Sequence, residues 1–97
     1  MDRQNYEQLW SAAFSYYAAA RVCGDQSTVE KAKNSFRRAM NYGEFHDILP
    51  NQAKQFRTDP NYYISQGEEM YAKQKWVSCE QVRHYVEQLD DATRKLP

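Results

Sequence analysis

The sequence contains few of the residues that usually build a hydrophobic core. Only four Leu, two Ile, five Val and four Phe are present among 97 residues, a proportion at which many chains are disordered. Disorder, however, also goes with a large net charge and few aromatic residues. Here 13 basic residues balance 13 acidic ones, and eight Tyr and two Trp are present. We therefore expect a folded domain whose core is built from Ala, Tyr, Trp and Met.

Other scarce features argue against whole classes of protein. The absence of a net positive charge disfavours a protein that binds polyanions through surplus Lys and Arg. The most apolar run, Ala18–Ala20, is far too short to span a bilayer, and the polar residues 2–5 do not resemble a secretory signal. Two cysteines, Cys23 and Cys79, are too few for a disulfide framework. We therefore expect a cytoplasmic protein with reduced thiols and no membrane contact.

Helical patterns dominate the first half of the chain. Apolar residues recur at spacings of three and four, which gives each predicted helix one buried face. Asp2 is the expected N-cap of the first helix, and Gly24 is expected to end it in the left-handed conformation. Ser27 and Glu30 fit a capping box at the start of the second helix. Gly43 is expected to end that helix.

The second half carries equally clear start signals. Asp59 and Pro60 suit the N-cap and first position of a helix, although Gly67 weakens its centre. Ser78 and Gln81 form a second capping box, which begins the last helix. Between residues 44 and 57 we expect only a short helical turn or two.

These signals predict the fold class. No strand-like alternation of useful length is present, and short connections favour antiparallel neighbours. We predict one all-α domain over residues 1–97, a small antiparallel helical bundle of about four main helices with a short helical turn near the middle. The predicted helices cover residues 3–22, 28–42, 60–74 and 79–95.

The segment 71–86 resembles the helix-turn-helix of prokaryotic and phage regulators. That motif places a small residue on its first helix and hydrophobic residues in the turn and on the second helix. These places are occupied here by Ala72, Val77, Val82 and Tyr85. The glycine that the family usually has in the turn is replaced by Trp76, for which a positive φ is strained.

The resemblance implies a DNA-binding transcriptional regulator that uses residues 60–90. Gln81 and Arg83 would then read adenine and guanine, while four carboxylates on the same helix would oppose a polyanion. The alternative is two packed helices joined by a turn. The DNA-contacting residues that the resemblance implies are Lys73, Lys75, Gln81, Arg83 and His84.

Catalytic and metal-binding patterns are missing. Cys79 is expected in the first turn of a capped helix, where a thiol can be activated. Of its two candidate bases, His46 is distant in sequence, and His84 lies five residues on and faces away from Cys79 on a helix. No Cys-x-x-Cys or His-x-x-x-His spacing and no glycine-rich phosphate loop occurs. We predict an inert Cys79, a small core residue at Cys23, and no enzyme activity, cofactor or metal.

The abundance of Tyr and Trp favours a protein interface, which such residues often anchor. We predict a small intracellular, non-enzymatic protein that docks an aromatic-rich helical surface on a protein partner, as phage or plasmid products do when they inhibit or regulate a host machine. A homodimer is also compatible, and nucleic acid is the alternative partner. The basic segment 30–38 is either a solvated helix face or a surface for an acidic partner. The candidate partner-binding residues are Tyr62, Tyr63, Tyr71, Trp76, Lys31, Lys33, Arg37 and Arg38.

Overall fold

The computed structural model describes all 97 residues and contains five α-helices and no strand. The helices are α1 (Arg3–Cys23), α2 (Gln26–Phe45), α3 (Asn51–Thr58), α4 (Pro60–Gln74) and α5 (Cys79–Arg94). The predicted all-α bundle is confirmed, and the short helical segment near its middle is α3. None of the five helices combines the length and the apolar character that crossing a membrane requires.

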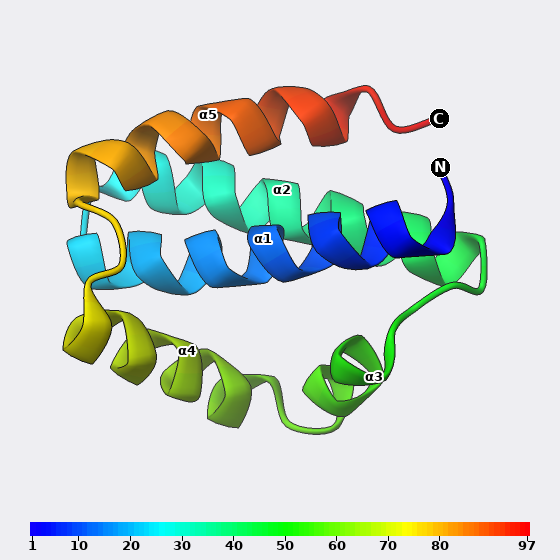
Figure 1. The fold of residues 1–97 in the computed structure, drawn as a ribbon, viewed down its shortest axis with the longest axis horizontal. Coiled ribbons are helices and arrows are strands. Elements are labelled where there is room, and N and C mark those ends of the chain that lie inside the picture. The colour runs from blue at the N-terminus through cyan, green and yellow to red at the C-terminus, as the bar shows by residue number, and fades with distance from the viewer.

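The central element is α1 (Figure 1). Helices α2, α4 and α5 all pack on α1, and α5 also packs on α2. Helices α4 and α5 therefore lie on opposite sides of α1, below and above it in Figure 1. The packed hairpin that the sequence suggested for the last two helices is not formed, because α5 finds its partners in α1 and α2.

Local sequence signals set most of the helix ends. Asp2 caps α1, and Gly24 ends it with a φ of 83°. Asp59 caps α4 as predicted. The reciprocal capping box of α5 is also present: Ser78 Oγ accepts from the Gln81 backbone N–H at 3.1 Å, and Gln81 Oε1 accepts from the Ser78 backbone N–H at 3.0 Å.

The start of α2 differs from the prediction. Asp25, rather than Ser27, is the N-cap, and its carboxylate accepts hydrogen bonds from both the hydroxyl and the backbone N–H of Thr28. These hydrogen bonds lower the pKa of the Asp25 carboxyl, and the bond from the Thr28 hydroxyl has the larger effect. Because Thr28 is buried, tertiary packing selects the earlier of two residues that can both cap a helix.

The end of α2 also differs, because Gly43 lies inside the helix. A Cβ atom at Gly43 would overlap the hydroxyl group of Tyr6. Tyr6 is fully buried and donates a hydrogen bond to the Ala39 carbonyl at 2.7 Å. Burial, with a smaller contribution from Glu44, raises the pKa of Tyr6 to about 12. Gly43 therefore serves a close approach of α1 to α2 rather than a helix stop.

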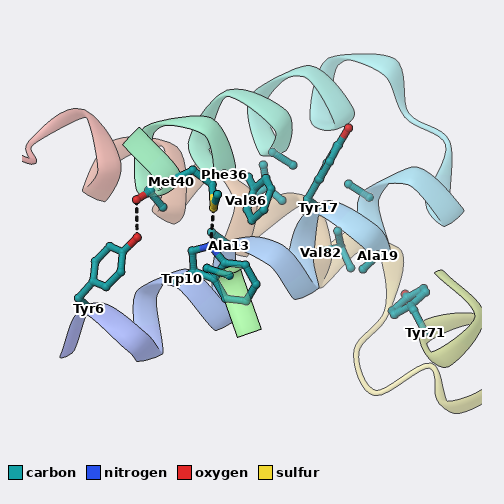
Figure 2. Packing of buried hydrophobic residues seen from close by; sticks show 14 residues of the cluster. Tyr6, Trp10, Ala13, Tyr17, Ala19, Phe36, Met40, Tyr71, Val82 and Val86 are labelled. Carbon is teal, nitrogen blue, oxygen red and sulfur yellow. Dashed lines mark hydrogen bonds between the residues drawn. The ribbon is translucent and has the colours of Figure 1, made fainter. Parts of the chain in front are cut away.

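Aromatic rings form the centre of the core (Figure 2). Trp10, Phe14, Phe36 and Phe56 surround one another with ring centroids 5.1 to 6.4 Å apart. Phe56 and the fully buried Ala53 dock α3 on the core. The indole N–H of Trp10 lies 2.8 Å from the sulfur of Met40. Alanine is the commonest buried residue around the rings, and the core contains Phe36, Val82 and Val86 in addition to the expected Ala, Tyr, Trp and Met.

Ion pairs join α2 to α5, and we call the residues that form them, together with Arg94, the charged seam. Asp90 accepts from Arg38 Nη1 at 2.8 Å and from Arg94 Nε at 3.1 Å. A second pair, between Lys31 and Glu87, lies further along the same two helices. The charged seam therefore comprises Lys31, Arg38, Glu87, Asp90 and Arg94.

Cys23, the last residue of α1, and Cys79, the first residue of α5, form a disulfide. Their Cα atoms are 5.7 Å apart, although 56 residues separate them in the sequence. The prediction of reduced thiols is therefore wrong. The disulfide can form because α5 packs antiparallel on α1, which places the end of α1 beside the start of α5 (Figure 1).

Candidate protein-docking surface

Trp76 lies in the loop between α4 and α5 and packs on aromatic rings from α1 and α4. The centroid of its ring is 5.1 Å from that of Tyr16 and 5.6 Å from that of Tyr71, both in edge-to-face geometry. Tyr85 joins the group through Tyr16, at 5.3 Å. Burial, and to a lesser degree the neighbouring Tyr85, raises the pKa of Tyr16. Trp76 and Tyr85 remain 40% and 38% exposed, so the group is open to a partner.

The backbone of this loop is fixed by its neighbours. Lys75 ends α4 in the left-handed conformation, with a φ of 43° and its N–H donating to the Tyr71 carbonyl at 2.8 Å. The hydroxyl of buried Tyr71 donates to the Val77 carbonyl at 2.7 Å. The positive φ of the turn therefore falls at Lys75 rather than at Trp76, and Trp76 is held between two anchored residues.

Two hollows adjoin Trp76, and no charged side chain lines either of them. The first, of about 420 Å³, lies over α1, and the second, of about 160 Å³, lies between α1 and α4. The first is lined by Gln8, Ser11, Ala12, Ser15, Tyr16 and Trp76. The second is lined by Phe14, Ser15, Tyr63, Gln66, Gly67, Met70 and Trp76. We call these residues, together with Tyr85, the Trp76 surface.

Gly67 shapes the second hollow by bringing α4 close to α1. A Cβ atom at Gly67 would lie 2.9 Å from the Cβ of Ala18 and 3.3 Å from the ring of Phe14. Any larger residue would push the two helices apart. The glycine that weakens α4 locally is therefore used for helix packing.

The aromatic residues predicted to bind a partner have three different environments. Tyr63 and Trp76 line the hollows. Tyr62 is 53% exposed beside Tyr63, with ring centroids 5.1 Å apart, but lines neither hollow. Tyr71 is buried beneath Trp76 and supports the surface without reaching solvent.

The cationic residues predicted to bind a partner lie on α2, away from both hollows. Lys31 and Arg38 are paired with carboxylates of α5 in the charged seam. Lys33 and Arg37 are exposed and form no ion pair. The structure therefore divides this basic segment between intramolecular pairing and a solvated face.

The residues implied by the helix-turn-helix resemblance do not form such a unit, because α1 lies between α4 and α5. Lys73 pairs with Glu69 at 2.8 Å, which raises the pKa of Lys73 and lowers that of Glu69. Gln81 is engaged in the capping box. The remaining predicted residues, Lys75, Arg83 and His84, are exposed.

Tyr16, Tyr85 and Met70 belong to the Trp76 surface but were not among the predicted partner-binding residues. Tyr16 lies beside the apolar stripe of α1 rather than on it, and Tyr85 follows the spacing of a core residue on α5. Only the packing of α5 and α4 on α1 shows which sides of these residues stay open.

No protein family, curated protein or solved structure matches this chain. No group of three or more His, Cys, Asp or Glu side chains is arranged to hold a metal ion.

Proposed function

We propose that the protein is a non-enzymatic binding protein that docks on a protein partner through the Trp76 surface. The observation that carries this proposal is the composition of the two hollows, which are lined by aromatic, small and uncharged residues and by Met70. Cores of protein interfaces are enriched in aromatic residues and Met and depleted in charge. Scattered exposed apolar residues are ordinary, but here they adjoin two hollows.

Trp76 is the proposed anchor of this interface. Tryptophan is among the residues that most often dominate binding energy at interfaces. The contacts of Trp76 with Tyr16 and Tyr71 restrict its ring before a partner arrives. A side chain that is already ordered loses less conformational entropy on binding, so this arrangement favours affinity.

A nucleic-acid partner has less support from the geometry. Protein contacts with nucleic acid go largely to phosphate and sugar, and neither hollow carries Lys or Arg. Arg83 remains exposed on α5, so DNA binding stays a prediction that gel-shift measurements can test. Inhibition of a host machine also stays a prediction. The cytoplasmic location also stays a prediction, and the Cys23–Cys79 disulfide argues against it, since disulfides persist mainly in oxidising compartments.

Site-specific photo-crosslinking in the cells that produce the protein tests the proposal. A photoreactive phenylalanine analogue at Tyr85 or Met70 should yield one discrete crosslinked protein. The same analogue at Arg37, exposed on α2, is the matched control and should yield none. The variant Trp76→Ala should abolish the crosslink from Met70.

Three results would contradict the proposal in different ways. Equal crosslinking from Arg37 would move the binding site to α2. A product of twice the chain's own mass would replace an external partner by a homodimer. Crosslinking to nucleic acid would favour the DNA-binding alternative.

A further inference from the structure

The hydroxyl of Tyr71 lies beside both sulfurs of the disulfide. Its Oη atom is 3.6 Å from Cys23 Sγ and 3.8 Å from Cys79 Sγ, and it donates to the Val77 carbonyl at 2.7 Å. A tyrosine hydroxyl has one proton to donate, and disulfide sulfurs carry none. While the disulfide is intact, that proton is therefore committed to the loop that carries Trp76.

The two sulfurs have unlike electrostatic surroundings. Cys79 is the first residue of α5, and Cys23 is the last residue of α1. The partial positive charge at a helix N-terminus stabilises a thiolate, whereas a helix C-terminus opposes one. Both cysteines line a hollow of about 530 Å³ that Lys75 also lines. A thiolate is therefore better stabilised at Cys79, and a small reagent can enter beside it.

We propose that Cys23–Cys79 is a reversible thiol-exchange site whose redox state controls the loop that carries Trp76. The thiolate of a low-molecular-weight thiol attacks Cys23 Sγ, the Sγ–Sγ bond breaks, and Cys79 leaves with the electron pair as a thiolate. A second molecule of the same thiol then attacks the mixed disulfide and releases Cys23. Two external thiols are oxidised to one disulfide and their two electrons pass to the cysteine pair; one of their protons goes to Cys23 and the other to solvent, so that Cys79 stays a thiolate.

The released Cys79 thiolate competes with Val77 for the proton of Tyr71. Hydrogen bonds to an ionised acceptor are roughly twice as strong as those between neutral groups. The Tyr71 hydroxyl therefore turns to Cys79, and the Val77 carbonyl loses its donor. Residues 75–78 then loosen, and Trp76 leaves its position against Tyr16. That this lowers partner binding rests on the proposed function, whereas the exchange and the loop change do not.

The first experiment tests the direction of exchange with two single variants. Cys23→Ser leaves only the Cys79 thiol, and Cys79→Ser leaves only the Cys23 thiol. At neutral pH we expect iodoacetamide to alkylate Cys79 at least about tenfold faster than Cys23. In the wild type, glutathione should be found on Cys23 when the mixed disulfide is trapped and mapped. Equal alkylation rates, or glutathione on Cys79 alone, would overturn the proposed direction.

The second experiment follows Trp76 in the intact protein. Hydrogen exchange of the peptide covering residues 75–78 is compared before and after reduction by glutathione, with circular dichroism as the check on folding. We expect exchange in this peptide to accelerate about tenfold while the helical signal is retained. Tyr71→Phe is the matched control: it should exchange fast in both redox states.

The outcomes of the second experiment separate the two proposals. Unchanged exchange on reduction, or the same acceleration in Tyr71→Phe, overturns the coupling through Tyr71. Loss of the helical signal on reduction would show a purely structural disulfide and would also overturn it. If the loop responds to reduction but the variant Trp76→Ala still shows the crosslink from Met70, only the proposed function is contradicted.

Discussion

The charged seam and the Trp76 surface are built on opposite principles. In the charged seam, each cation is paired with a carboxylate of the same chain, so these charges fix the position of α5 on α2. The hollows of the Trp76 surface have no charged lining residue, and the rings of Trp76 and Tyr85 remain partly exposed. In a chain without net charge, ion pairs join α2 to α5, and the exposed rings of Trp76 and Tyr85 are the ones we propose for docking.

The largest expected effect comes from removing one tryptophan rather than the other. Trp10→Ala should lower the free energy of unfolding by about 3–5 kcal/mol, because it empties the centre of the aromatic core. Trp76→Ala should cost only about 1 kcal/mol, since much of its ring is exposed. Urea denaturation measures both values. Equal losses would mean that Trp76 is a core residue and that the Trp76 surface is not free for recognition.

The next effect breaks the charged seam at its centre. Asp90 is nearly buried and serves two arginines, so Asp90→Ala leaves the half-buried Arg38 without a counter-charge. We expect a loss of about 3 kcal/mol. The matched control is Asp91→Ala, whose exposed pair with Lys95 is worth roughly 0.5 kcal/mol or less. Similar thermal stability of the two variants would show that the seam does not orient α5.

A third effect concerns a neutral polar contact, which belongs to neither region. The pKa of Tyr6 is about 12 in the fold against 10.0 ordinarily, so folding favours the protonated phenol. The raised pKa stabilises the folded protein by about 2–3 kcal/mol. This stabilisation is fully present below pH 10 and is lost as the pH rises through 12. Stability measured across this range should fall more steeply for the wild type than for Tyr6→Phe. A constant difference between them would contradict the prediction.

The smallest effect lies at the exposed end of the charged seam. The side chains of Lys31 and Glu87 are 40% and 53% exposed, so water and salt screen their attraction. A double-mutant cycle should give a coupling of about 0.5 kcal/mol that disappears at high salt. A larger, salt-independent coupling would make the seam uniform along its length, contrary to the contrast with Asp90.

Much of the secondary structure was predictable because helix ends depend on neighbouring residues. The caps at Asp2, Asp59 and Ser78 need only a side chain and a backbone N–H three residues away. The two wrong ends of α2 have tertiary causes. Asp25 is preferred over Ser27 through the packing of buried Thr28, and Gly43 faces Tyr6 from another helix.

The candidate site was less predictable because it depends on contacts between distant segments. Trp76 and Tyr63 could be predicted as candidate partner-binding residues from their residue type alone. The role of Tyr16 requires α5 to place Tyr85 beside it, and the disulfide requires the ends of α1 and α5 to meet. Two cysteines 56 residues apart carry no local pattern that distinguishes a pair from two free thiols.

The disulfide also determines which part of the chain can bear a mechanical load. Residues 24–78, which include α2, α3 and α4, lie inside the covalent ring that the bond closes. Tension applied between Met1 and Pro97 passes through the two sulfurs and bypasses this ring. A pulled molecule therefore lengthens only by unravelling α1 and α5 until the bond is reduced, when the contour length of the enclosed helices is released.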